Sequence, residues 1–385
     1  MSNKITSVSS RTGYLTLLLV LGVGIRSSTA QVLESSGSIS LHLEWSVGGD
    51  ESAEAEYLFG RPNWAAATST GGVAVSDAMS LDIRLFGPEG THLSTLGARG
   101  DAPGEFQAVT SFTVDSLDRV IVLDGRLSRM TIFGPAASEV STASISRDEL
   151  LWPRRVQSSG DGRLQALARM PTHARRAQEA VANLLHSLDV TSARVVGRSV
   201  QFTTPYTESS SLDAQLFETL LQSHPGSMVL MGDHACVAPG LYSGRIICSD
   251  ARFQGDQSRP ALPEPVRAVD CDADSETGLI RILRRTEPRR LCGYIQVQSA
   301  GLFALSTAEL LHFYFVSDTS GGELRYEIIG AGGRLVETGV FSRSWPKAWH
   351  TQPPILLATS TGRHIYAIDS SPPSPTVSKY LLVRD

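Results

Sequence analysis

Two short segments of the chain combine an aromatic side chain, a proline and a cation. Trp152-Pro153-Arg154 and Trp345-Pro346-Lys347 share this order. A tryptophan offers a face for stacking and the neighbouring cation attracts acidic groups, so each unit suits a sugar, a peptide or an acidic ligand. An equally weighted alternative is structural, with the tryptophan packed between repeats and the proline shaping a loop. The candidate ligand-binding residues are therefore Trp152, Arg154, Trp345 and Lys347.

No catalytic motif accompanies these segments. The chain lacks the GxSxG of serine hydrolases and the HExxH of metallopeptidases. The acidic stretch 270–276 begins like a calcium loop, but Ser275 replaces the required glycine and Arg281 replaces the bidentate glutamate. We therefore predict no metal site and no cofactor, and catalytic residues stay unassigned. Nine histidines are scattered along the chain, and a fold that gathers distant segments could still bring several together: His42, His92, His173, His186, His224, His234, His312, His350 and His364.

An internal repeat indicates the elements that must position these residues. Residues 72–88 (GVAVSDAMSLDIRLFGP) match residues 119–135 (RVIVLDGRLSRMTIFGP) without a gap, 47 positions later. Each copy reads as a strand ending at an aspartate, Asp77 or Asp124, then a turn and a second strand. Weaker copies cover 312–329 and 363–383, where Asp369 takes the aspartate position. A repeat of this length made of short strands predicts a β-propeller.

The segment 83–106 (IRLFGPEGTHLSTLGARGDAPGEF), followed by 110–124 (TSFTVDSLDRVIVLD), resembles the six-bladed β-propeller family related to NHL-repeat proteins. In that family an outer hairpin with a glycine turn leads through a Gly-Pro-Gly-Glu-Phe type linker into the next blade. The resemblance implies a toroid with a central channel and leaves the activity open. We expect an all-β fold with six blades, seven being the alternative, and one propeller domain over residues 31–385.

Two further features refine this expectation. Residues 38–45 (SISLHLEW) alternate in polarity, so this early strand could join the last blade and close the ring. Short helical insertions are expected where apolar residues recur at helical spacing, over 177–188 and 212–221.

The N-terminus and the cysteines predict export. Lys4 and Arg11 precede an apolar run over 14–25, and small residues lead to cleavage after Ala30, as in a secretory signal peptide spanning 1–30. No later segment is apolar enough to span a membrane, so we expect a periplasmic or secreted protein. In an oxidising compartment the four cysteines favour disulfides. Three pairings are possible, and we favour the local pairs Cys236 with Cys248 and Cys271 with Cys292 over a zinc site.

Charge and motifs together favour a binding protein. The chain holds 34 basic and 39 acidic residues, a net charge of −5, which makes nucleic acid a poor partner. We expect an exported propeller that acts as a scaffold for a small molecule, a glycan or a protein. The alternative is a metal-dependent propeller lyase or hydrolase, with a calcium or zinc ion in the channel.

Overall fold

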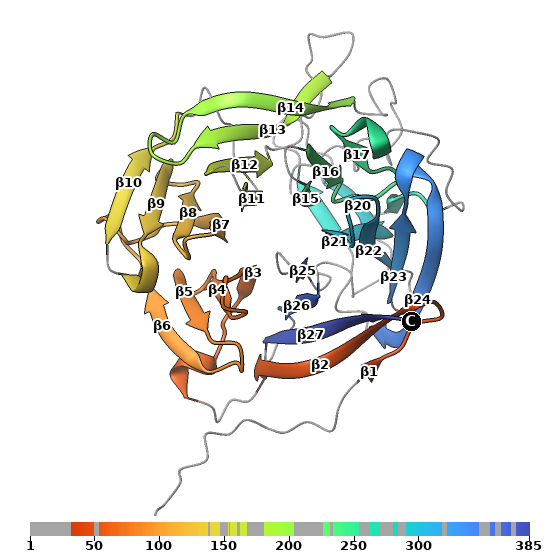
Figure 1. The fold of residues 1–385 in the computed structure, drawn as a ribbon, viewed down its shortest axis with the longest axis horizontal. Coiled ribbons are helices and arrows are strands. Elements are labelled where there is room, and N and C mark those ends of the chain that lie inside the picture. The colour runs from red at the N-terminus through yellow and green to blue at the C-terminus, as the bar shows by residue number, and fades with distance from the viewer. Residues whose placement is uncertain are drawn as a thin grey trace, which may run out of the picture.

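The computed structural model describes residues 32–49, 54–137, 139–146, 153, 155–159, 162–167, 181–203, 226–231, 234–253, 262–269, 280–283, 290–317, 322–345, 355–358, 363–370 and 375–385. These residues are nearly all β, with 61% in strands and 4% in helices. Six sheets stand around a central axis as the blades of a propeller (Figure 1). Both the all-β prediction and the choice of six blades over seven are confirmed.

The first three blades each have four antiparallel strands, and we number the blades in chain order. Blade 1 consists of β3 (Pro62–Ala67), β4 (Val73–Asp77), β5 (Asp82–Phe86) and β6 (His92–Leu96). Blade 2 consists of β7 (Val109–Val114), β8 (Val120–Asp124), β9 (Arg129–Phe133) and β10 (Val140–Ser144). Blade 3 consists of β11 (Arg155–Ser158), β12 (Arg163–Leu167), β13 (Val181–Asp189) and β14 (Val195–Thr203).

The second half of the ring is less regular. Blade 4 consists of β15 (Ser227–Met231), β16 (His234–Ala238) and β17 (Ile247–Cys248). Blade 5 consists of β21 (Val297–Ala304), β22 (Leu310–Ser317), β23 (Gly322–Ile329) and β24 (Leu335–Trp345). Blade 6 consists of β25 (Ile355–Ala358), β26 (His364–Asp369) and β27 (Thr376–Arg384), extended outward by β2 (Ile39–Gly48) and β1 (Val32–Leu33).

The first strand of each blade lies at the inner edge of the ring. Each inner strand contacts the next, in the order β3, β7, β11, β15, β21 and β25, and β25 returns to β3. Side chains on these six strands are therefore the ones placed to line the central channel.

The N-terminal strand closes the ring, as predicted. β2 pairs antiparallel with β27, which places Leu41 opposite Leu382. Ile39 and Leu41 are each 1% exposed and pack in the core between blades 5 and 6. Segments from opposite ends of the chain thus share one blade, which removes an open sheet edge.

The repeated aspartates hold equivalent positions, as predicted. Asp77 ends β4, Asp124 ends β8, and both are 1% exposed. Each buried carboxylate accepts backbone N–H groups from the segment before its blade and from the turn after its strand. Asp124 accepts four such bonds, from Gln107, Ala108, Arg126 and Leu127. This strand-to-turn cap explains why the repeat keeps an aspartate at a buried site.

One of the two predicted helical insertions is wrong. Residues 181–189 form β13, paired on both sides with β12 and β14. Leu185 and His186 are neighbours in sequence and both buried, so both faces of the strand are covered at this point. Burial on both faces breaks the two-residue period and imitates a helical pattern. The second predicted segment, 212–221, lies outside the described residues.

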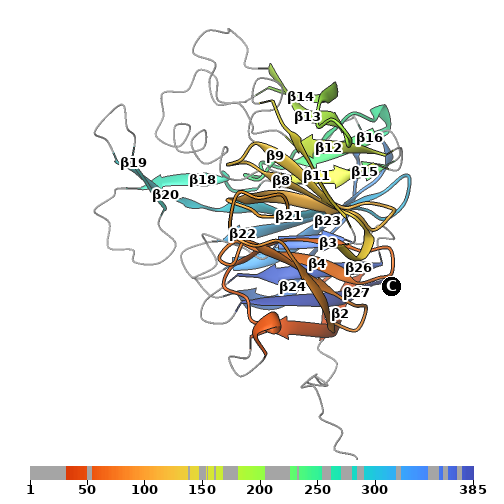
Figure 2. The same cartoon turned by 90° about the vertical axis from the view of Figure 1, so that its left-hand side faces the viewer.

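The helices described are four short 3₁₀ turns, η1 (Ala55–Tyr57), η2 (Pro135–Ala137), η3 (Ala251–Phe253) and η4 (Ala331–Gly333). A seventh sheet stands apart from the ring: β18 (Val266–Val269), β20 (Arg290–Ile295) and β19 (Ile280–Leu283), with β20 in the middle. Figure 2 shows this sheet projecting beyond the ring, to the left in that view. It is an insertion between blades 4 and 5.

Candidate functional site

An aromatic ring and a cation meet at the inner edge of the ring. The guanidinium of Arg155 lies over the indole of Trp64, 3.7 Å from the ring centroid. Trp64 is on β3 of blade 1 and Arg155 is on β11 of blade 3, so the contact passes along the inner edge of blade 2 (Figure 1). Two blades that are not neighbours therefore meet through a cation–π contact at the channel.

Hydrogen bonds fix both members of this pair. The indole Nε1 of Trp64 donates to the carbonyl of Phe112 on β7, at 2.8 Å. The Nε of Arg155 donates to the carbonyl of Gly226, just before the inner strand of blade 4, at 3.3 Å. We call Trp64 and Arg155 the channel pair; its contacts span blades 1 to 4 and hold a positive charge at the inner edge.

The aromatic and cationic residues predicted from the sequence are a different set. Trp345 is the last residue of β24, the outermost strand of blade 5, and its side chain is not described. Trp152, Arg154 and Lys347 lie outside the described residues, so their binding role stays a prediction. Sequence reasoning missed Trp64 and Arg155. The repeat could have placed Trp64 on an inner strand. A shift of 47 residues aligns Trp64 with Ser111, which lies in the inner strand β7.

A second polar cluster lies between blades 4 and 5. His312 on β22 stands directly opposite Glu327 on β23, with Nδ1 3.0 Å from Oε1. The Nε2 of His312 lies 3.0 Å from the hydroxyl of Ser299 on β21. We call Ser299, His312 and Glu327 the relay. It runs across three adjacent strands of blade 5, from the innermost strand outward.

Residues from blade 4 complete this cluster. The Tyr242 hydroxyl donates to Glu327 Oε1, and its ring meets the His312 imidazole edge to face at 4.3 Å. The Ser299 and Ser227 hydroxyls share a hydrogen bond of 3.0 Å. His312 and Tyr242 are fully buried and Glu327 is 2% exposed, whereas Ser299 and Ser227 are half-buried. The relay therefore connects a dry interior to a partly open end at the inner strands.

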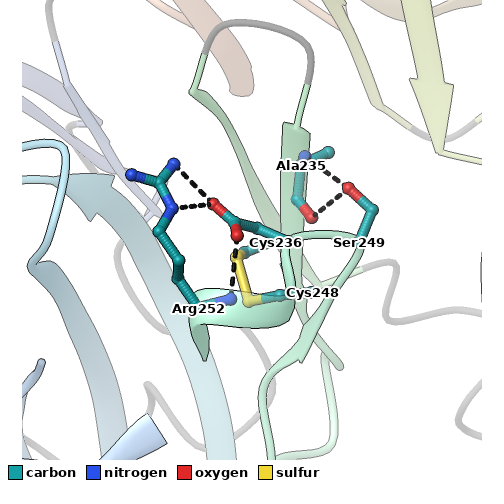
Figure 3. The surroundings of a disulfide bond; sticks show 6 residues. Ala235, Cys236, Cys248, Ser249 and Arg252 are labelled. Atoms are coloured by element: carbon teal, nitrogen blue, oxygen red, sulfur yellow. Dashed lines mark hydrogen bonds and ion pairs between the residues drawn. A yellow bond between two sulfur atoms is a disulfide. The ribbon is translucent and has the colours of Figure 1, made fainter. Parts of the chain in front are cut away.

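One predicted disulfide is confirmed in blade 4. Cys236 on β16 is bonded to Cys248 on β17, directly opposite it in the sheet. Figure 3 shows the bond, with Ser249 bridging the Ala235 backbone beside it. Cys292 is also disulfide-bonded, and its expected partner, Cys271, lies outside the described residues. The confirmed bond is compatible with an oxidising compartment outside the cytoplasm.

Burial lowers the pKa of a further histidine, His186 on β13. His186 is 9% exposed, and its Nδ1 has no hydrogen-bond partner. Desolvation, followed by the charge of Arg198 on the facing strand, lowers its pKa from 6.5 to about 4. His186 is thus neutral near pH 7, a state that acid removes.

Neither a metal-binding cluster nor a membrane-spanning helix is present among the described residues. These residues contain no group of three or more His, Cys, Asp or Glu side chains able to hold a metal ion. None of the helices in this part of the chain is long and apolar enough to span a membrane. The ion of the lyase or hydrolase alternative stays an untested prediction.

Comparison with known proteins identifies a fold. The structure is similar to a DUF4221 family member from Bacteroides vulgatus, with a TM-score of 0.50 and 10% identity over 91% of this chain and 99% of that one. The RRP9 WD40 repeats match with a TM-score of 0.47 and 12% identity, over 92% and 99% of the two chains. Virginiamycin B lyase from Staphylococcus aureus matches with a TM-score of 0.42 and 9% identity, over 84% and 96%.

These similarities extend to the fold alone, because the identities are so low. No protein-family model matches the sequence, and no curated protein does. The six-bladed ring expected from the resemblance is present, but membership of the NHL-repeat family is not confirmed.

Proposed function

We propose that this protein is an exported β-propeller of one domain that binds a small carboxylate ligand at its central channel. The observation that carries the proposal is the channel pair, a guanidinium stacked on an indole at the inner edge of the ring. Binding residues in rigid folds concentrate where several elements converge, and here blades 1 to 4 converge on two side chains.

The chemistry of the pair favours an anion. A guanidinium presents its N–H groups in a planar fork that matches the two oxygens of a carboxylate. Stacking on the Trp64 ring restrains the plane of this fork, so less side-chain entropy is lost on binding. The guanidinium stacks on the indole, so the indole supports the cation that we propose as the ligand-binding group. Export is supported by the signal-like segment 1–30 and the Cys236–Cys248 disulfide.

A calorimetric titration tests this function. D-glucuronate combines a carboxylate with a sugar ring, and D-glucose is its uncharged comparison. We expect saturable binding of glucuronate and none of glucose. In Arg155→Gln the loss of a charged hydrogen bond, worth about 1.5–3 kcal/mol, should weaken binding roughly 10- to 100-fold.

The matched control removes the same charge elsewhere. Arg325 pairs with Glu323 on β23, away from the inner strands, so Arg325→Gln should bind glucuronate like the parent protein. Equal binding by Arg155→Gln and Arg325→Gln, or no saturable binding by the parent, would reject the channel pair as a carboxylate site.

A further inference from the structure

We infer that the relay is a serine acyl-transfer site, with Ser299 as nucleophile, His312 as general base and Glu327 as the group that orients the base. The inference is independent of carboxylate binding at the channel pair. It rests on three residues, 13 and 15 positions apart in sequence, held within hydrogen-bond distance by neighbouring strands. Unrelated folds build serine hydrolases from this same order of groups, which is recognised by geometry and role.

The hydrogen bonds of Glu327 indicate which ring nitrogen of His312 carries the proton. With the carboxylate ionised, Oε1 only accepts; the Tyr242 hydroxyl donates to it, and His312 Nδ1 lies 3.0 Å from it. Nδ1 must then carry the imidazole proton, which leaves Nε2 of the neutral ring as an acceptor. The neighbour of Nε2 is the Ser299 hydroxyl, 3.0 Å away. The Ser299 hydroxyl donates to Ser227 Oγ, so for the transfer its proton rotates from Ser227 to His312 Nε2.

Burial gives the three groups suitable surroundings. His312 and Glu327 lie in the interior, and the Tyr242 ring covers the imidazole edge, so water is excluded from the base. Ser299 is half-buried on the inner strand β21 and is the least buried of the three relay residues. The pairing of β21 with β22 also shifts between Ser299 and Gly301. Bulges of this kind re-aim a side chain and occur often beside active sites.

The reaction that fits is hydrolysis of a small carboxylic ester. Ser299 Oγ attacks the ester carbonyl while its proton passes to His312 Nε2, and the alcohol leaves with that proton. Water then attacks the acyl-serine, losing one proton through His312, and releases the acid with Ser299 restored. The sum is ester plus water to acid plus alcohol. A short acyl chain is expected because only the serine end of the relay is open.

Two reagents test the inference on the mature protein. Diisopropyl fluorophosphate forms an Oγ–phosphorus bond and releases fluoride only at an activated serine, and peptide mapping locates the adduct. p-Nitrophenyl acetate reports turnover. We expect the adduct on the peptide that contains Ser299, and at least a tenfold fall in ester hydrolysis in Ser299→Ala.

Ser111 provides a matched control. It lies on β7, also an inner strand, and its hydroxyl bonds to the next blade through the Val156 amide. Ser111→Ala removes an equivalent interblade bond and should keep both reactivities. Failure of folded parent protein to form an adduct on Ser299 would overturn the proposal even if a variant misfolds. So would ester hydrolysis that is unchanged in Ser299→Ala.

Discussion

Acid should destabilise this propeller through His186 before the carboxylates titrate. The pKa of this buried imidazole falls from 6.5 to about 4 on folding, so the unfolded chain binds a proton that the folded chain resists. A lowered folded-state pKa means that the stabilisation is complete above pH 6.5 and is lost as the pH falls toward 4. The loss from this one group is about 0.8 kcal/mol at pH 6, about 2 kcal/mol at pH 5 and about 3 kcal/mol at pH 4.

Urea unfolding at pH 7.5, 6, 5 and 4.5 measures this loss, with His186→Leu as the reference that cannot titrate. The difference in unfolding free energy between parent and variant should change by about 2 kcal/mol between pH 7.5 and pH 5. Arg198→Gln removes the facing charge, the second cause of the lowered pKa, and should reduce this change. Parallel stability curves for parent and His186→Leu would show that His186 is not buried as a neutral group.

Three other changes test the architecture. Replacing Cys236 and Cys248 by serine opens a short loop and should lower the unfolding free energy by roughly 3 kcal/mol, measured by urea unfolding against the oxidised parent. Asp124→Ala leaves four backbone donors without their acceptor and should cost about 3 kcal/mol in the same assay, whereas the exposed Glu139→Ala should change stability by less than about 0.5 kcal/mol. Leu41→Asp places a charge in the closing strand and should expose β2 to limited proteolysis, while uncut β2 would argue against ring closure by that strand.

The repeat predicted the ring because each copy carries a local requirement that the sequence displays. Asp77 and Asp124 are the acceptors that join a strand end to its turn, and any blade built this way needs one. Local turn chemistry is readable without tertiary information. The closing strand was predictable for the same reason, since its alternation is local.

Secondary structure was harder to predict where both faces of a strand are covered. All five residues of β4 are buried, including Ser76, so a blade strand does not alternate as an open sheet would. In β13 the same double burial produced the helical spacing that misled the prediction. Neighbouring blades determine this burial, and a single segment of sequence does not report which neighbours it will have.

Both candidate sites depend on how strands and blades are paired, which a single segment of sequence does not show. His312 faces Glu327 because β22 and β23 pair in one register, and a shift of one residue would turn His312 to the other side of the blade. The channel pair depends on the order of the blades, which places β11 and β3 on opposite sides of β7. Sequence spacing shows neither condition, so His312 seemed one scattered histidine among nine and Trp64 attracted no attention. In a propeller, the order of strands and blades determines which side chains meet. In both clusters the interacting residues lie on different strands, so their separation in sequence does not reveal the contact.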